Sequence, residues 1–279
     1  MKHRASNEVP PLDLIEQAFH LLRQSDPRTL LCHLIGSLPF LLGVLYFWSD
    51  MARGIDAADH LPAAALALTA QFFWLKIWQA IFAQQLLAQL RGEPRWEWSW
   101  RKLGRLAVAQ IILQPAGLFL LPVALVLTVP FGWAFAFFQN ATAIGAEDDG
   151  TGATAKLAWR MARLWSVQNH QILAVLLPFA FLVFLNVLTV ALAIPFLIKM
   201  LFGVESAITR SPEAAFNTTF LAAAGALTWL GVDPFLKAVY VLRCFHGRAR
   251  HTGADLLAGL RFSAATDRSF AAAEKEAAR

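Results

Sequence analysis

One stretch decides the fold class: LAVAQIILQPAGLFLLPVALVLTVPFGWAFAFFQNATAIGA, residues 106–146. Its 41 residues include no Asp, Glu, Lys or Arg. A second uncharged run, residues 164–198, is 35 residues long. A bilayer takes about 20 apolar residues for each helical pass, so the first run has the length of two passes. These runs predict an all-α, polytopic membrane helix bundle.

The composition of the chain agrees with this fold class. Hydrophobic residues make up 57% of the chain and charged residues 15%, whereas globular proteins average about 45–50% and about 25%. The formal net charge is +5. The Lys and Arg residues lie between the apolar runs, where they meet anionic lipid headgroups, so lipid and not nucleic acid is the predicted partner.

Turn-forming residues and polar loops divide the chain into about six predicted spans, with a break in the longest run near Pro130 and Gly132. The spans are residues 29–49, 61–90, 106–128, 133–146, 171–193 and 214–244. They give three parts: an N-terminal segment 1–28, a membrane domain 29–250 and a polar cytoplasmic tail 251–279.

Residues 11–23 of the N-terminal segment read as an amphipathic helix. One face carries Leu12, Ile15, Phe19 and Leu22, at steps of 3, 4 and 3. A helix of this kind before a first span is expected to lie at the membrane interface. Asp26 and Pro27 predict its end, because the residue before proline avoids helical geometry.

The distribution of basic residues predicts the orientation. Of the 24 Lys and Arg residues, 19 lie in the N-terminal segment, alternate loops and tail, and only 3 lie in the opposite loops. The positive-inside rule then places both termini in the cytoplasm. With no signal peptide at the N-terminus, we expect a multi-pass protein of the bacterial cytoplasmic (inner) membrane.

Short similarities predict two related halves, residues 11–105 and 152–260. Ala18–Arg23 resembles Ala158–Arg163, and Phe73–Lys76 resembles Pro234–Lys237. Each half would comprise a cytoplasmic interfacial helix, a span with a proline and a span with a buried lysine. Membrane folds built from repeats often place a site where the halves meet.

Three charged residues inside the spans are the candidate intramembrane site: Lys76, Asp233 and Lys237. A charged side chain in hydrocarbon costs about 2.5–3.5 kcal/mol on insertion scales, so it is expected to face protein or water. Asp233 pairs either with Lys237, one helical turn away, or with Lys76 across the bundle. A site for an anion or a proton, a structural ion pair and snorkelling of Lys237 towards the headgroups all stay open.

The sequence Gly231-Val232-Asp233-Pro234 suggests a local role for Asp233. Aspartate at the N-cap followed by proline is a helix start signal, which predicts a break in the last span. The interpretation as a cap is favoured over an anion site at the new helix start.

The cytoplasmic face offers the candidate contact surface for headgroups or a partner protein. Its basic residues are Arg101, Lys102, Arg243, Arg248 and Arg250. The alternative is that they only enforce orientation. No catalytic motif, metal-ligand spacing or cofactor signature is found, so no catalytic residue, metal or cofactor is predicted.

The C-terminal segment resembles a known family. Pro234, Tyr240, Arg243, Arg248, Thr252-Gly253 and Asp255-Leu256 follow one another as in an uncharacterised bacterial six-span inner-membrane family. That family is similar to the membrane domain beside glycerophosphoryl diester phosphodiesterase domains. Val241 and Thr252 depart from its pattern, which often has an acid after the Tyr and a Glu before the Gly. No phosphodiesterase domain is present, so the resemblance implies a six-span membrane fold and no activity.

The expected function is therefore non-catalytic, namely a membrane scaffold or accessory subunit that binds lipid or a partner protein. A transporter or channel component with a midplane site at Lys76, Asp233 and Lys237 is the second hypothesis. A membrane enzyme of lipid metabolism ranks third, because the usual nucleophiles and acids are missing.

Overall fold

The computed structural model describes residues 8–54, 56–93, 99–128, 131–146, 150–211, 217–261 and 263, which include no strand. The helices are α1 (Pro11–Arg23), α2 (Pro27–Arg53), α3 (Ala57–Leu90), α4 (Trp100–Leu113), α5 (Pro115–Leu127), α6 (Phe131–Ile144), α7 (Thr151–Arg163), α8 (Ser166–Phe202), α9 (Ala207–Arg210) and α10 (Thr218–Thr252). The predicted all-α fold is confirmed. The expected boundary at Asp26 and Pro27 is also found, since Asp26 accepts a hydrogen bond from the Arg28 backbone N–H (2.8 Å) and caps α2.

Among the described residues, five segments are long and apolar enough to cross a bilayer: α2, α3, α4–α5, α8 and most of α10. The prediction of six spans is wrong at residues 133–146, where α6 has only 14 residues. A helix of that length is about 21 Å long, short of a hydrocarbon core of about 30 Å. Most of α6 is buried against other helices, so enclosure by protein explains its lack of charge.

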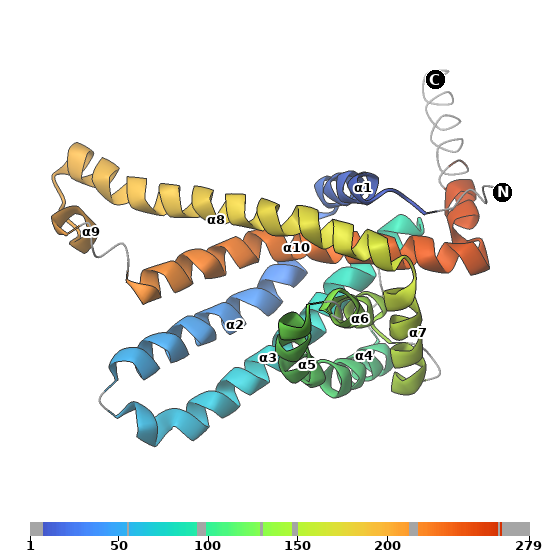
Figure 1. Cartoon of the computed structure of the whole chain (residues 1–279), viewed down its shortest axis with the longest axis horizontal. Coiled ribbons are helices and arrows are strands. Elements are labelled where there is room, and N and C mark those ends of the chain that lie inside the picture. The colour runs from blue at the N-terminus through green and yellow to red at the C-terminus, as the bar shows by residue number, and fades with distance from the viewer. Residues whose placement is uncertain are drawn as a thin grey trace, which may run out of the picture.

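Four long helices, α2, α3, α8 and α10, run along the longest axis of the molecule (Figure 1). α2 pairs with α3, α8 pairs with α10, and α10 also contacts α2 and α3. We call the end that holds α7 and the C-terminal end of α10 the basal end, and the end that holds α9 the distal end (Figure 1). The helices of each pair, α2 with α3 and α8 with α10, are antiparallel. α1 and the C-terminal end of α10 therefore both lie towards the basal end.

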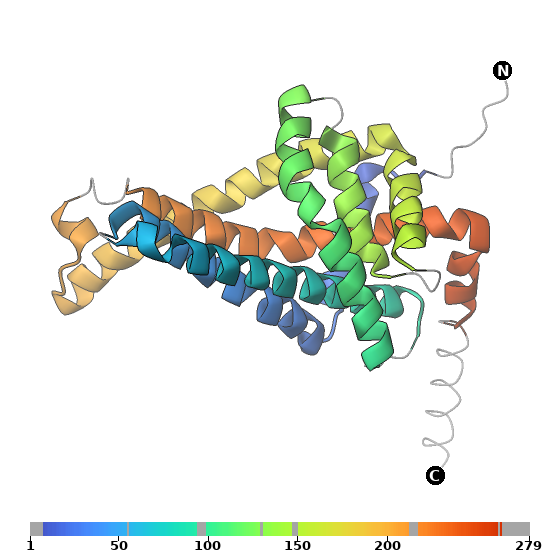
Figure 2. The ribbon, with the colours of Figure 1, turned by 90° about the horizontal axis from the view of Figure 1, so that it is seen from below.

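The segment α4–α6 runs across the long helices instead of alongside them. Figure 2 shows α4 and α5 crossing the direction of the long helices and α6 returning beside α5. The break predicted in the longest uncharged run falls between α5 and α6, and Pro115 adds a bend between α4 and α5. α5 exposes large apolar side chains, with Val126 82% exposed, which is a surface suited to lipid.

The order of the helices follows the predicted repeat. α1 and α7 each have 13 residues, and each precedes a long helix with an internal proline. Pro39 is the thirteenth residue of α2 and Pro178 the thirteenth of α8, while Lys76 and Lys237 are each the twentieth residue of their helices. The relation of the two halves by descent stays a prediction.

The main hydrophobic core lies towards the basal end, where α1, α3, α6, α7, α8 and α10 meet. Its members include Leu14, Phe82, Ile144, Met161 and Val239, all buried. The amphipathic character predicted for α1 is present, but the buried face differs from the predicted stripe: it carries Leu14, Ala18 and Leu21, with Ile15 and Leu22 at its margin. Leu12 and Phe19 are exposed, because α1 packs on α10 with one side and leaves a second apolar side open.

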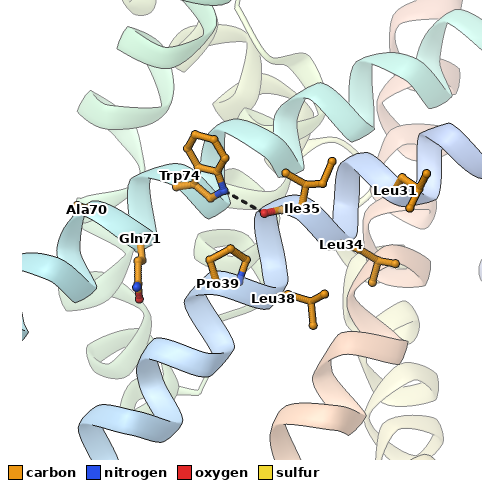
Figure 3. Close-up of a pocket in the computed structure, with 8 residues that line it drawn as sticks. All are labelled: Leu31, Leu34, Ile35, Leu38, Pro39, Ala70, Gln71 and Trp74. Carbon is orange, nitrogen blue, oxygen red and sulfur yellow. Dashed lines mark hydrogen bonds between the residues drawn. The ribbon is translucent and has the colours of Figure 1, made fainter.

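The α2–α3 pair shows how a proline is accommodated. Pro39 has no N–H, so the carbonyl of Ile35 loses its usual helical donor. Trp74 of α3 donates its Nε1–H to Ile35 O at 2.9 Å (Figure 3). In hydrocarbon, where water is absent, this bond satisfies the carbonyl that the proline leaves free.

Candidate functional site

The centre of the candidate site is an ion pair on one face of α10. Lys237 Nζ lies 3.7 Å from Asp233 Oδ1, one helical turn away. Of the two pairings that the sequence left open, the structure therefore has Asp233 with Lys237. The predicted helix break is wrong, since α10 continues through Pro234 and Asp233 does not cap a new helix. Side chains of other helices contact the Asp233 carboxylate, and a local capping motif in the sequence does not reveal such contacts.

Three polar side chains from other helices complete this cluster. Gln79 of α3 donates Nε2–H to Asp233 Oδ2 at 2.7 Å. His33 of α2 places Nδ1 3.8 Å from the same oxygen. Lys237 donates to Gln139 Oε1 of α6 at 2.6 Å. The cluster thus joins α2, α3, α6 and α10, and its two charges are 2–3% exposed.

Two polar atoms of the cluster have no hydrogen-bond partner among the described residues, namely His33 Nδ1 and Gln79 Oε1. His33 Nε2 lies 3.2 Å from Ser37 Oγ, one turn further along α2. A buried polar group without a partner costs about 1–3 kcal/mol. Beside a carboxylate and an ammonium, such groups mark a place where a proton or a polar solute would find bonding partners.

Lys76, the third predicted member, makes no direct hydrogen bond or ion pair with the described residues of this cluster. Its side chain is half-buried and its Nζ lies 5.5 Å from the centre of the Phe72 ring, a cation–π arrangement. It forms no ion pair with any described carboxylate. Of the three charged residues, only Asp233 and Lys237 are therefore in direct contact.

The positions of Lys76 and Asp233 along their helices can be counted from the polar residues at the distal end. Lys76 lies 16 residues from the polar distal residue His60, and Asp233 lies 16 residues from Asn217 at the start of α10, about 24 Å in each helix. The hydrocarbon core is about 30 Å thick. Both groups therefore lie more than half of that thickness along their helices from these distal polar residues.

Arg243, expected at the headgroups, points into the protein. It is 2% exposed, and its guanidinium donates to the carbonyl oxygens of Met161 (2.9 Å), Leu164 and Trp165 (3.4 Å) and to Gln168 Oε1 (3.2 Å). These carbonyls lie where α7 ends and α8 begins, so Arg243 satisfies helix-end acceptors. This burial contradicts its predicted role in headgroup contact.

Tyr240 of α10 is a further buried polar side chain. Tyr240 donates its hydroxyl to Asn169 Oδ1 at 2.6 Å, and Asn169 donates to the Gly132 carbonyl, also at 2.6 Å. Tyr240 and Arg243 thereby attach α10 to α6, α7 and α8. Both belong to the stretch that resembles the six-span family, and both have structural roles in it.

The other predicted basic residues lie at or near the surface. Arg101 and Lys102 are exposed at the start of α4, and Arg250 lies 5.5 Å from the centre of the Trp165 ring. Arg248 is half-buried and borders a hollow of about 230 Å³ with Glu93. Most of the predicted tail, from residue 264, lies outside the described residues.

Two apolar hollows open on the lipid-facing surface. The first, of about 700 Å³, lies between α2 and α3 beside Pro39 and Trp74 (Figure 3). The second, which we call the α1 groove, has a volume of about 750 Å³. It is lined by Leu12, Ile15, Glu16, Phe19, Leu22 and Arg23 of α1, Phe179 and Val183 of α8, and Gly231, Val232 and Phe235 of α10. The whole predicted stripe of α1 thus faces a groove.

His33, Gln79 and Gln139 were missed by the sequence analysis because they carry no formal charge or sit near a span boundary. A signal for them exists: amide side chains recur through the apolar helices, and several are buried. They are Gln79, Gln85, Gln110, Gln114, Gln139, Asn140, Gln168 and Asn169. Polar side chains in membrane helices are expected to bond across helices, as Gln79, Gln110 and Asn169 do here.

Comparison of the chain with protein-family models, with curated proteins and with solved structures finds no match in any of the three. The resemblance of residues 234–256 to the six-span family therefore stays a prediction. Among the described residues, no group of three His, Cys, Asp or Glu side chains is placed to hold a metal ion.

Proposed function

We propose that this chain is a non-catalytic, multi-pass protein of the bacterial cytoplasmic membrane that binds lipid and serves as a scaffold or accessory subunit. The observation that carries the proposal is the α1 groove, an apolar hollow of about 750 Å³ bordered by an arginine. Ligand pockets typically have volumes of about 300–1,000 Å³. An acyl chain is the ligand that the bilayer supplies to such a hollow.

The chemistry of the groove fits a phospholipid. Phe179 and Phe235 form a ring pair with centroids 5.6 Å apart, an apolar wall for a chain. Arg23, in the last turn of α1, is exposed and supplies a cation for a phosphate. The second charged side chain, Glu16, has His20 Nε2 3.7 Å from its Oε1. The groove thus combines a long apolar wall with one guanidinium at its margin.

The proposed orientation places the basal end and both termini in the cytoplasm. It rests on the 19-to-3 distribution of Lys and Arg between the two sets of loops. The helix arrangement supports it, since the long helices α2, α3, α8 and α10 give an even number of passes while α4–α5 runs across them (Figure 2). α1 and the end of α10 accordingly lie towards the same end of the molecule (Figure 1). Arg23 then faces the inner leaflet, where anionic lipids are concentrated.

The test is lipid retention by protein purified in mild detergent, measured by native mass spectrometry. We expect Val183→Trp, which fills the groove, to lower retained phospholipid by about tenfold, or about 1.4 kcal/mol of binding free energy. Arg23→Gln is expected to lower the preference for phosphatidylglycerol over phosphatidylethanolamine. The matched control is Val126→Trp on exposed α5. Equal lipid retention by Val183→Trp and Val126→Trp would reject the proposal.

A second candidate function is a transporter or channel component. The observation that favours it is the pair of unpartnered atoms, His33 Nδ1 and Gln79 Oε1, beside the Asp233–Lys237 pair. Vesicles with an internal pH dye would report proton flux under a pH gradient. A transporter should lose flux in Asp233→Asn and in Lys76→Met while staying folded. A lipid-binding scaffold should show no flux in any of these forms.

A further inference from the structure

The distal half of α8 carries an unusual stripe. Leu182, Asn186, Thr189, Ala193, Phe196 and Met200 follow one another at steps of 4, 3, 4, 3 and 4. This is the a/d spacing by which two helices pack with interlocking side chains. All six residues are exposed, so no described element of the chain covers them.

Both polar residues in the apolar part of α8 belong to this stripe. Between Ile172 and Ile198, Asn186 and Thr189 are the only residues with polar side chains. Asn186 lies 13 residues before Lys199, about 20 Å along the helix and well inside a hydrocarbon core of about 30 Å. The stripe therefore presents an amide and a hydroxyl at membrane depth.

The hydrogen bonds of these two side chains are incomplete. Asn186 donates from Nδ2 to the Leu182 carbonyl at 2.8 Å, and Thr189 donates to the Leu185 carbonyl at 2.8 Å. Asn186 Oδ1 accepts no hydrogen bond from a described residue, and an amide has a second N–H to donate. Lipid tails offer neither a donor nor an acceptor, so the unmet groups need a partner from another protein surface.

We infer that the partner is a second copy of this chain, packed α8 to α8 as a two-fold dimer with Asn186 at the contact. An amide is self-complementary, because its N–H donates to the carbonyl oxygen of an identical amide. All copies insert with one orientation, so their α8 helices run parallel and each residue of the stripe meets its own mate. A single asparagine at an a position is a known determinant of two-stranded register.

Cysteine cross-linking in native membranes tests this contact. The background replaces both cysteines of the chain, Cys32→Ala with Cys244→Ser. Cysteine is introduced by Ala193→Cys, an exposed stripe position that leaves the amide in place, or, as the control, by Leu66→Cys. Leu66 of α3 is 72% exposed and lies outside the stripe. Oxidation is expected to give a band of twice the chain mass for Ala193→Cys and little for Leu66→Cys. Equal bands, or a band at any other mass from Ala193→Cys, would overturn the proposal.

The role of the amide is tested by counting subunits through single-molecule photobleaching at graded densities in lipid. Interhelical hydrogen bonds in membranes contribute about 0.6–2 kcal/mol, so Asn186→Leu is expected to weaken dimerisation by about 3- to 30-fold. Asn186→Gln, which keeps the amide, should retain most of the dimer affinity. A dimer affinity unchanged by Asn186→Leu would contradict the amide contact, and wild-type protein that is monomeric at every density would overturn the dimer.

Discussion

The basal and distal ends of this molecule differ in how their polar side chains are satisfied. At the basal end α1, α3, α6, α7, α8 and α10 enclose one another, and polar side chains such as Gln79, Asn169 and Arg243 bond across helices. At the distal end the long helices are mostly exposed, and polar side chains such as Thr69 bond back to their own helix. In the basal region neighbouring helices satisfy these polar groups, whereas in the lipid-exposed part of the distal region Thr69, Asn186 and Thr189 bond to their own helices.

This difference predicts where a substitution changes stability. At the basal end a polar side chain is the partner of groups that no solvent reaches, so its loss leaves them unsatisfied. At the distal end a side chain faces lipid both before and after the substitution, so little stability is lost. Stability is best compared by thermal unfolding in one detergent, with all variants at the same protein-to-detergent ratio.

The largest effect is expected for Arg243→Ala. The substitution removes the side-chain donor to the carbonyls of Met161 and Leu164 and opens a cavity under α7. We expect a loss of about 4–6 kcal/mol in unfolding free energy, enough to abolish folded protein. The control is Arg250→Ala, whose exposed cation–π contact is worth about 0.5–1 kcal/mol. Similar losses in both variants would remove the distinction between buried and exposed arginines.

A smaller loss, of about 3–5 kcal/mol, is expected for Asp233→Leu, because Lys237 is left buried without its counter-ion. Replacing both residues by leucine should recover at least about 2 kcal/mol of that loss, since no unpaired charge then stays inside. The measurement is the unfolding midpoint of the single and double variants. A double variant less stable than Asp233→Leu would mean that the pair itself stabilises the basal end.

The next effect, of about 1–2 kcal/mol, concerns Trp74→Phe, which removes the donor to Ile35 O. Pro39→Ala restores a backbone N–H for the same carbonyl, so Trp74→Phe should cost less in that background. A double-mutant cycle on the unfolding free energy measures the coupling. Strictly additive changes would show that the indole bond does not compensate for the proline.

The smallest effect is expected in the distal loop after α8. Lys199 Nζ lies 3.1 Å and Arg210 Nε 3.2 Å from the carboxylate of Glu205, and the hydrogen bond from Lys199 lowers the pKa of that carboxyl. Because the folded-state pKa is lowered, the contribution of Glu205 is present above its ordinary pKa and is lost as pH falls through the lowered value. Unfolding midpoints of wild type and Glu205→Gln should differ slightly at pH 7 and coincide at low pH. A gap that widens on acidification would contradict this sign.

Several local features were predicted from sequence because neighbouring residues determine them. The start of α2 follows from Asp26 and Pro27, since an N-cap and a proline act within one turn. The pairing of Asp233 with Lys237 was one of two alternatives, and the i,i+4 geometry of a continuous helix produces it. The direction of Arg243 was also accessible, because Asp233, Lys237, Tyr240 and Arg243 share one face of α10 at steps of 4, 3 and 3.

By itself, then, the sequence determined that this chain is an all-α membrane protein, because long uncharged runs indicate which segments avoid water. Only the tertiary structure decided what excludes the water at each position. α6 avoids it inside the protein, α5 by facing lipid, and the buried amides by bonding to helices far away in the chain. Hydropathy is a property of a residue, whereas enclosure depends on which helices meet, and that is set by contacts between segments as distant as Gln79 and Asp233.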